Sequence, residues 1–267
     1  MNEFFSRSEA LLGSETMESL RTKRVILFGV GGVGSWCAEA LIRTGLTHLT
    51  IVDGDTVQPS NINRQLPATR ETLGRPKVEV LKERLLTINP EAEIVAIYKM
   101  YEPTPIPSLK GGEPGKSFPL GEDLGEALSE YNYVIDAIDS VAAKTDLILR
   151  ATRVKGLKIF SSMGAALRFD PTKVTVGELM DIKGDALAKA VRARMKRLGV
   201  KPYKKIKCVY SLENSHPTPS LSQGEGEKRE AIKGSLMQVT AVFGCTLASL
   251  VIEDIKKGAR YVMNPKS

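Results

Sequence analysis

The residues most able to do chemistry begin with a run of glycines near the N-terminus. Gly29-Val-Gly31-Gly32-Val-Gly34 directly follows the apolar run at 25–28 and precedes a helix-like stretch. Glycines permit a tight turn and let the backbone approach a phosphate chain, which then lies at the positive end of the helix. The run therefore predicts a nucleotide site with Gly29, Gly31 and Gly32 in contact. Alone, it fits a nicotinamide or flavin enzyme, an ATP-using enzyme, or a turn that only packs a helix on a sheet.

Polar and charged side chains follow the next apolar run. Asp53 ends the run at 48–53, where a carboxylate can hold the ribose hydroxyls of a nucleotide. Asn61-Ile-Asn63-Arg64-Gln65 then supplies amides and a guanidinium, and Lys77 opens a later helix-like stretch. Positive charges beside a glycine turn suit a triphosphate under attack, because negative charge builds on the phosphoryl oxygens. Hydride transfer has no use for them, so these residues favour an ATP-using enzyme.

Two carboxylates follow a later apolar run. The run at 133–136 ends in Asp136, and Asp139 comes three residues afterwards. The carboxyl edge of a doubly wound sheet is where ligands bind, and carboxylates beside a triphosphate usually hold Mg²⁺. Each residue taken singly also has a structural explanation, since aspartates cap helices and arginines and lysines are common surface charges. It is their combination that predicts a magnesium and ATP site.

The composition predicts an ordinary soluble globular protein. The chain has 267 residues, of which 42% are hydrophobic and 26% charged, enough for one large or two small domains. Cys37, Cys208 and Cys245 lie far apart without a C-x-x-C pair, so we expect neither a zinc site nor disulfides, and a cytoplasmic location. The longest apolar stretch, 239–252, is interrupted by small polar residues. We expect a buried C-terminal helix there and no integral membrane segment.

The net charge of +7 is concentrated in one segment. Residues 183–207 contain ten lysines and arginines against a single acid, Asp185. A segment of this density attracts phosphate backbones and predicts a salt-dependent nucleic-acid contact. The alternative is a solvated helix face, which most charge runs on helices are.

Alternating strands and helices must position these residues. Periodicity predicts strands at 24–29, 48–53, 93–98, 133–136 and 157–161 and helices at 35–44, 76–87, 123–130 and 140–154. Alternation of this kind predicts a Rossmann-like α/β fold, with a doubly wound, mostly parallel sheet and helices on both faces.

The remaining segments flank this core. We expect a helical lead-in at 1–20, an ATP-binding domain at 21–180 and a C-terminal extension at 181–267 packed on the same domain. Beyond residue 160 the pattern predicts strands at 173–176 and 206–210 and the basic helix at 185–198. The Ser-, Pro- and Gly-rich stretch 213–230 is either an unordered linker or a lid.

Several motifs together resemble the adenylation fold of ubiquitin-activating-like enzymes, a group that includes bacterial activators of sulfur-carrier proteins. The glycine run is followed, in order, by Asp53-Gly-Asp55-Thr-Val, Ser60-Asn-Ile-Asn-Arg-Gln65, Gly74-Arg-Pro-Lys77-Val-Glu and Asp136-Ala-Ile-Asp139. The resemblance covers about residues 5 to 180.

This resemblance implies roles for individual residues. The implied ATP contacts are Gly29, Gly31, Gly32, Asp53, Asp55, Asn61, Asn63, Arg64, Gln65, Lys77 and Asp139. Among these, Arg64 and Lys77 stabilise the transferring phosphoryl charge, and Asp139, with Asp136 beside it, holds Mg²⁺. The resemblance also implies a homodimer in which Arg7 reaches the partner subunit's ATP as an arginine finger.

Within that group the chain is most similar to the tRNA threonylcarbamoyladenosine dehydratases. The matching segments are Phe5-Ser-Arg7, Phe28 to Ser35, Thr44-Gly45, Val134 to Ser140, Ser161 to Ala166, Phe169-Asp-Pro-Thr172 and Cys208-Val-Tyr-Ser211. The resemblance implies that the threonyl carboxylate of the modified adenosine beside the anticodon is adenylated by ATP, and that intramolecular ring closure then expels AMP. The tRNA is expected on the basic helix, at Arg192, Arg194, Lys196 and Arg197.

Three other functions are weighed against this one. An adenylyltransferase for the C-terminus of a ubiquitin-like sulfur-carrier protein is disfavoured, because the paired zinc cysteines common in those enzymes are absent and a basic helix is present. A dinucleotide oxidoreductase and a non-catalytic RNA-binding relic both leave the polar residues without a role. Association with sulfur-delivery or desulfurase-type partner proteins stays open.

An intramolecular nucleophile needs no enzymic cysteine, so we expect no obligatory thioester. Cys37 and Cys245 are expected in the core, and the role of Cys208 is left open. His48 and His216 are expected to be structural or solvated rather than general bases.

Overall fold

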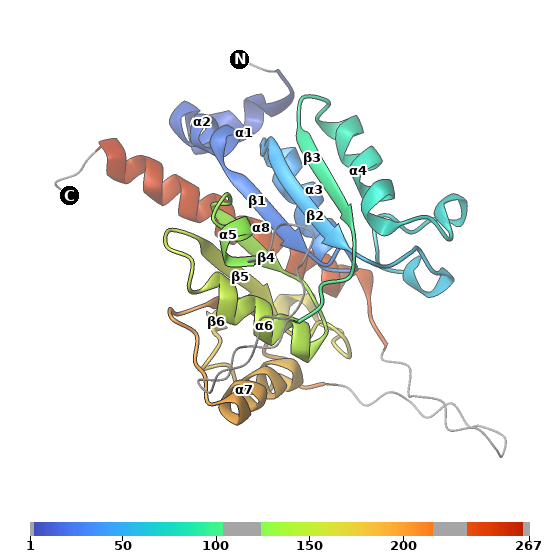
Figure 1. Cartoon of the computed structure of the whole chain (residues 1–267). Coiled ribbons are helices and arrows are strands. Elements are labelled where there is room, and N and C mark those ends of the chain that lie inside the picture. Colours follow the sequence, from blue (N-terminus) through green and yellow to red (C-terminus); the bar gives the residue numbers. More distant parts are fainter. Residues whose placement is uncertain (1–2, 104–123, 216–233, 264–267) are drawn as a thin grey trace.

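A single seven-stranded sheet forms the centre of the molecule (Figure 1). The computed structural model describes residues 3–103, 124–215 and 234–263. The strands are β1 (Arg24–Phe28), β2 (His48–Asp53), β3 (Glu93–Tyr98), β4 (Tyr133–Asp136), β5 (Lys158–Ser162), β6 (Val174–Glu178) and β7 (Lys207–Ser211). They lie in the order β3-β2-β1-β4-β5-β7-β6, and every neighbouring pair is parallel except β6 with β7. The predicted doubly wound, mostly parallel α/β fold is confirmed.

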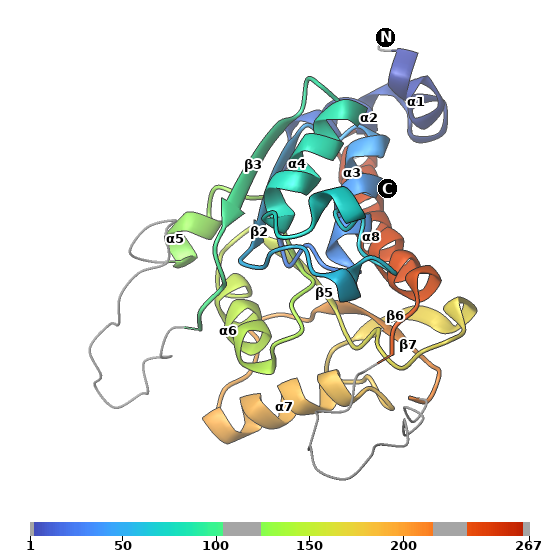
Figure 2. The ribbon, with the colours of Figure 1, turned by 90° about the vertical axis from the view of Figure 1, so that its right-hand side faces the viewer.

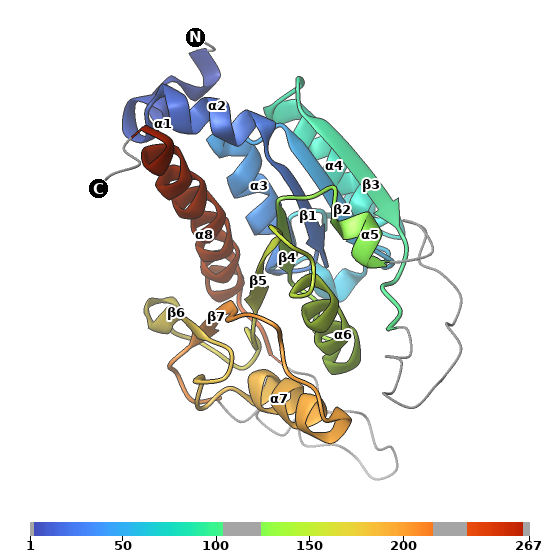
Figure 3. The same ribbon diagram turned by 60° about the vertical axis from the view of Figure 1, so that its left-hand side comes forward.

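Helices cover both faces of the sheet (Figures 2 and 3). The elements α3 (Gly34–Thr44), α4 (Lys77–Ile88) and α8 (Met237–Met263) lie on one face, and α5 (Leu124–Leu128), α6 (Val141–Ala151) and α7 (Ala186–Leu198) lie on the other. In β1, Val25 and Leu27 join the first core while Ile26 and Phe28 join the second, because successive side chains of a strand point to opposite faces. Both faces are therefore buried, as expected of a parallel sheet.

The segment beyond residue 180 is built into this sheet. Strand β7 lies between β5 and β6, and α7 and α8 cover opposite faces. The boundary predicted between 21–180 and 181–267 thus falls within one sheet, because β6 lies before it and β7 after it. Residues 216–233, which contain His216 and most of the predicted linker or lid, lie outside the described residues.

The helical lead-in consists of η1 (Glu3–Phe5), α1 (Ser6–Leu12) and α2 (Ser14–Thr22), which packs against α8. Within α8, the segment Met237–Ala259 is long and apolar enough to cross a membrane by length and composition alone, yet half of it is buried. The same test is passed by core helices of soluble proteins. One expectation for this helix was wrong, because Cys245 is exposed rather than in the core.

Close packing of α8 on α3 depends on a glycine. A Cβ atom added at Gly244 would lie 2.4 Å from the carbonyl oxygen of Val33, whereas one added at Gly258 in the same helix would meet nothing within 4 Å. We expect Gly244→Ala to lower the free energy of unfolding by about 1–3 kcal/mol through overpacking. The matched change Gly258→Ala should instead be neutral or stabilising by up to about 1 kcal/mol, because alanine favours helix. Urea unfolding of both variants tests this, and equal effects would contradict the packing.

Candidate active site

The glycine turn lies at the switch point of the sheet. Strands β1 and β4 are neighbours at the centre, and chain connections run outward from them in opposite directions. In doubly wound sheets ligands bind outside the carboxyl ends of the strands at such a point. Gly29 has a φ of +86°, and a Cβ atom at Gly34 would lie 1.8 Å from the carbonyl oxygen of Gly29. Only glycine fits these two positions. The turn therefore presents partly exposed backbone at the N-terminus of α3, a site suited to an anion.

Asp53 connects the end of β2 to this turn. One carboxylate oxygen accepts a hydrogen bond of 2.7 Å from the backbone N–H of Val30, and the other accepts 2.8 Å from the N–H of Asp55. Burial is the main reason why the pKa of Asp53 is raised above its ordinary value. The carboxylate lies beside the turn, where the sequence predicted a ribose contact.

Lys77 begins α4 and points to the same region. Its side chain is 6% exposed, and Nζ donates a hydrogen bond of 2.7 Å to Oδ2 of Asp55, whose side chain is 53% exposed. A nearly buried ammonium with one solvent-exposed partner is held in place but can exchange that partner for an incoming phosphate.

The loop after β2 carries Arg64 to the turn. A Cβ atom at Gly32 would lie 3.4 Å from Cδ of Arg64, so the two residues are in contact range. Nη1 of Arg64 donates to the carbonyl of Ser60 at 2.8 Å and to Oδ1 of Asn63 at 2.9 Å. The indole N–H of Trp36, in α3, donates to the carbonyl of Arg64 at 3.0 Å. These contacts fix a guanidinium beside the glycine backbone.

Two of the side-chain amides in this loop are hydrogen-bonded within the protein, and the third has an oxygen without a partner in the part of the chain that the structure describes. Asn61 is buried and its Oδ1 accepts from the N–H of Gln58, while Nδ2 of Asn63 donates to the carbonyl of Ser235. Gln65 is buried against Gly31, and its Oε1 has no hydrogen-bond partner among the described residues. The Gln65 atoms nearest to the Gly31 position are Nε2 and Cδ. Because buried polar atoms are normally paired, Oε1 marks the amide of Gln65 as a group that could accept from a nucleotide hydroxyl or amino group.

Asp139 follows β4 in a loop that lies against the turn. The N–H of Ala137 donates to the carbonyl of Phe28 at 2.8 Å, and a Cβ atom at Gly29 would lie 2.8 Å from the carbonyl oxygen of Ala137. Asp139 itself is exposed. In the described part of the chain no three His, Cys, Asp or Glu residues gather as a metal cage. A lone carboxylate suits Mg²⁺, which takes one or two protein carboxylates and completes its shell with phosphates and water.

Asp136 does not fit the predicted metal role. Its side chain is fully buried, and Oδ2 accepts hydrogen bonds of 2.6 Å from both Nζ of Lys144 and Oγ of Ser161. Oδ1 accepts from the N–H of Ile138 at 3.1 Å. Because the side chain has no exposed surface and is already paired with the Lys144 ammonium, the carboxylate is not free to bind an ion. Of the two predicted metal ligands, Asp139 is therefore the one whose carboxylate is available.

A comparison with protein families decides which family the chain represents. The model described as the ThiF family matches residues 5–262, nearly the whole chain. The chain belongs to the ThiF family. A tRNA threonylcarbamoyladenosine dehydratase of Bacillus subtilis is 36% identical over 212 residues, or 79% of this chain and 75% of the relative.

Solved structures resemble this ThiF chain along almost its full length. The crystal structure of Escherichia coli tRNA N6-threonylcarbamoyladenosine dehydratase in complex with AMP matches with a TM-score of 0.79 and 31% identity. The same enzyme in complex with ATP matches with a TM-score of 0.77 and 30% identity. Each comparison covers 96% of this chain and 95% of the other.

Arg7 is not brought to the glycine turn of its own ThiF subunit. It is exposed on α1, which packs on α2, and α2 leads into the beginning of β1. The glycine turn follows the other end of β1, so the two lie at opposite ends of the sheet. Any contact of Arg7 with ATP requires a second chain, as the prediction of an arginine finger states.

The cysteines of this ThiF chain do not supply an evident nucleophile. Cys37 and Cys208 are buried, and burial raises the pKa of both thiols far above the ordinary range. Cys245 is exposed on α8, and burial of part of the residue raises its pKa as well. His48 pairs with Glu93 at the beginning of β2 and β3, away from the turn.

Sequence reasoning missed residues that approach the turn from distant parts of this ThiF chain. A Cβ atom at Gly32 would lie 3.3 Å from the side chain of Thr240, at the beginning of α8. The segment before α8 also accepts a hydrogen bond from Leu167, through the carbonyl of Gly234. Packing of the last helix creates these contacts, and no local pattern signals them. Lys144 was missed too. Asp136 ends a predicted strand and Lys144 lies in the helix that follows, so the sequence offered a signal that the two could pair.

Proposed function

We propose that the chain is an ATP-dependent tRNA threonylcarbamoyladenosine dehydratase that acts through an acyl-adenylate. The observation that carries this function is that the segments bearing Arg64 and Asp139 lie against the glycine turn, at Gly32 and at Gly29. Lys77 supports it from α4, where it pairs with Asp55 beside Asp53. Likeness to dehydratases over nearly the whole chain identifies the substrate class. The complexes of the E. coli enzyme with ATP and AMP supply support for ATP as the activating substrate.

ATP binds with its phosphates against Gly29, Gly31 and Gly32 at the N-terminus of α3. Asp53 receives the ribose hydroxyls, and the free Oε1 of Gln65 accepts from the nucleotide. Mg²⁺ fits beside Asp139, where it would neutralise part of the phosphate charge.

The protein activates a carboxylate, which is otherwise a poor electrophile. The threonyl carboxylate of the modified adenosine attacks the α-phosphorus of ATP, a bond to pyrophosphate breaks, and an acyl-adenylate forms. Arg64 and Lys77 stabilise the negative charge that builds on the phosphoryl oxygens, Lys77 by exchanging Asp55 for phosphate. Arg7 of a second subunit adds to this charge stabilisation, so the active form is a homodimer.

Ring closure follows without an enzymic nucleophile. The carbamoyl nitrogen or oxygen of the same substituent attacks the activated acyl carbon, a carbamoyl N–H loses its proton in either case, and AMP leaves with one former carboxylate oxygen. The overall change is loss of water. An intramolecular nucleophile has a high effective concentration, which agrees with the buried and unactivated thiols of Cys37 and Cys208.

The basic helix α7 is proposed to hold the tRNA. Its N-cap Asp185 accepts a hydrogen bond from the N–H of Gly164, just after β5, so the helix begins at the active-site edge of the sheet. Thirteen residues carry it about 20 Å along the molecule. Of the predicted contacts, Arg192 is partly committed, because Nη1 donates to the carbonyl of Leu179.

The other predicted contacts are available to phosphates. Lys196 and Arg197 are exposed and Arg194 is half-exposed, and the chain has no acidic residue between Asp185 and Glu213. Across the described ranges none of the three forms a salt bridge, whereas Arg24, Arg43, Arg75, Arg84 and Lys158 do. Unneutralised cations on one face favour a polyanion.

Neutralising three of these cations is expected to weaken tRNA binding and its salt dependence. For Arg194→Gln, Lys196→Gln and Arg197→Gln together, the slope of log K against log salt should fall by about 1 for each phosphate that the variant no longer neutralises. Equal neutralisation at the opposite end, by Arg21→Gln, Lys23→Gln and Lys257→Gln, provides the control. Filter binding at several salt concentrations measures both. If the two triple variants behave alike, α7 is only a solvated face.

Release of pyrophosphate tests the proposed activity. The purified chain with ATP and Mg²⁺ should release pyrophosphate on addition of tRNA that carries threonylcarbamoyladenosine. Unmodified tRNA should give no release. Release with a ubiquitin-like sulfur-carrier protein but not with tRNA would replace this proposal with the carrier-activating one. A cytoplasmic location belongs to the same proposal. The proposed chemistry uses no sulfur donor, so association with a sulfur-delivery or desulfurase-type partner is a separate question that pull-down with such a protein would test.

A further inference from the structure

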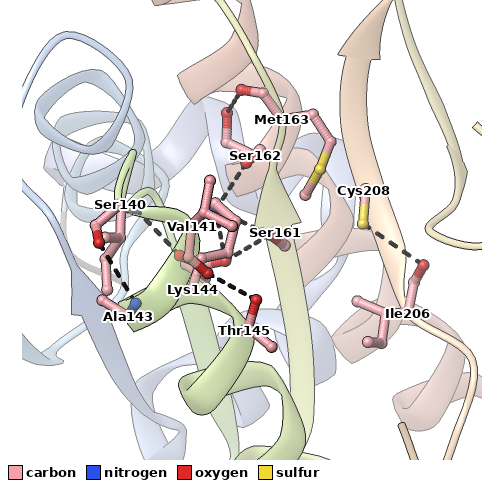
Figure 4. Close-up of polar contacts among 12 residues, drawn as sticks. Ser140, Val141, Ala143, Lys144, Thr145, Ser161, Ser162, Met163, Ile206 and Cys208 are labelled. Atoms are coloured by element: carbon pink, nitrogen blue, oxygen red, sulfur yellow. Dashed lines mark hydrogen bonds and ion pairs between the residues drawn. The ribbon is translucent and has the colours of Figure 1, made fainter. Parts of the chain in front are cut away.

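A lysine without exposed surface lies beneath the loop that carries Asp139. Lys144, in the first turns of α6, is 0% exposed. Its Nζ donates a hydrogen bond of 2.6 Å to Oδ2 of Asp136. It also donates to the carbonyl of Ser162 at 2.8 Å and to Oγ of Ser161 at 3.2 Å (Figure 4). An ammonium group has three donors, so all of them are used here. The network joins α6 to the ends of β4 and β5.

The same network holds the backbone of the loop. Oδ1 of Asp136 accepts from the N–H of Ile138, the residue directly before Asp139. On the other side of Asp139, Oγ of Ser140 accepts from the N–H of Ala143 and caps α6 (Figure 4). The segment 136–144 is thus joined at its two ends by the Lys144–Asp136 ion pair, and Asp139 lies in the loop between them.

Stability alone does not require a charged pair at this place. Replacing a buried ion pair by apolar residues of similar size is often neutral or stabilising, because burial of two charges is costly. Geometry therefore explains a charged pair at this place better than stability does. Short, charge-assisted hydrogen bonds fix direction as well as distance. Lys144 holds one oxygen of Asp136 in this way, and the other oxygen accepts a hydrogen bond from the N–H of Ile138 in the loop.

We propose that Lys144 is a positioning residue for adenylation: through Asp136 it fixes the loop 137–140, so that Asp139 faces the nucleotide phosphates. Lys144 touches neither ATP nor the transferring group, because it is fully buried. This inference rests on the proposed adenylation, and its test separates the two.

Hydrogen exchange in the free protein tests the positioning without any activity. The variants are Lys144→Met and the milder Ser161→Ala, which removes one hydroxyl from the network. The matched control is Ile148→Ala, which is also fully buried in α6 but belongs to the apolar core. We expect the hydrogen-bonded amides of this loop, those of Ala137 and Ile138, to exchange at least about tenfold faster in Ser161→Ala, and in Lys144→Met where it folds, but not in Ile148→Ala. Equal exchange in Ser161→Ala and wild type, or equal acceleration in the control, overturns the proposal.

A double-mutant cycle tests whether Lys144 acts through Asp139. Ser161→Ala, and Lys144→Met if folded, should raise the Mg²⁺ concentration needed for half-maximal AMP formation and lower kcat about tenfold. In an Asp139→Asn background the same change should cost almost nothing further, whereas equal losses in both backgrounds overturn the proposal. A further outcome is that the wild-type chain forms no AMP with either modified tRNA or a sulfur-carrier protein, while hydrogen exchange in the loop 137–140 still responds as expected. In that case the proposed function fails, and the inference that Lys144 positions the loop stands.

Discussion

Asp139→Asn is expected to lower the rate of AMP formation by about 10²–10³-fold, the usual cost of losing one group that stabilises transition-state charge. The amide has nearly the shape of the carboxylate but cannot supply the negative charge that Mg²⁺ requires. Because Asp139 is exposed, the thermal midpoint should not change. Single-turnover AMP formation, followed over a range of Mg²⁺ concentrations, measures the effect.

Asp181→Asn provides the control for this change. Asp181 is also exposed but lies in the turn after β6, at the far edge of the sheet. It should retain wild-type rates. Near-normal AMP formation by Asp139→Asn at limiting Mg²⁺ would exclude Asp139 as the metal ligand.

Lys77→Gln is expected to lower kcat by about 10²–10³-fold while the Kd for ATP changes much less. The ammonium is held by Asp55 in the free protein, so its full interaction with phosphate develops only as negative charge builds. Stability should change little, because the group left behind, Asp55, is half exposed to water. Rapid-quench kinetics and calorimetry of ATP binding separate the two quantities.

Lys82→Gln, further along the same helix, removes an equal charge without touching the turn. Its kcat and its Kd for ATP should match those of the wild type. A loss of ATP affinity in Lys77→Gln as large as the loss of kcat would show that Lys77 binds the ground state and does not stabilise the transition state.

The central sheet, and the place of most candidate site residues at its carboxyl edge, were predictable because their signals are local. Strands buried on both faces appear as continuous apolar runs, and the glycine run, Asp53 and Asp139 each stand within a few residues of such a run. Arg64 and Lys77 lie further along, in the loop and at the start of the helix that follow β2. Parallel strands place their carboxyl ends on one edge, so residues that follow different strands meet.

Interactions between distant segments could not be predicted in this way. Asp136 and Asp139 look equivalent in the sequence, and only the approach of Lys144 from α6 makes one a buried ion-pair partner and leaves the other exposed. Thr240 reaches Gly32 because Gly244 lets α8 pack closely on α3. Cys245 lies in an apolar run, but the run belongs to a helix with one exposed face.

An oxygen label tests the central claim, that a carboxylate of tRNA is adenylated. The substrate is tRNA in which the threonyl carboxylate of threonylcarbamoyladenosine carries heavy oxygen, and the products are analysed by mass spectrometry. Adenylation predicts that one labelled oxygen per turnover leaves in AMP and that the tRNA is lighter by the loss of water. Cyclised tRNA together with unlabelled AMP, or with ATP split only to ADP, would contradict the account.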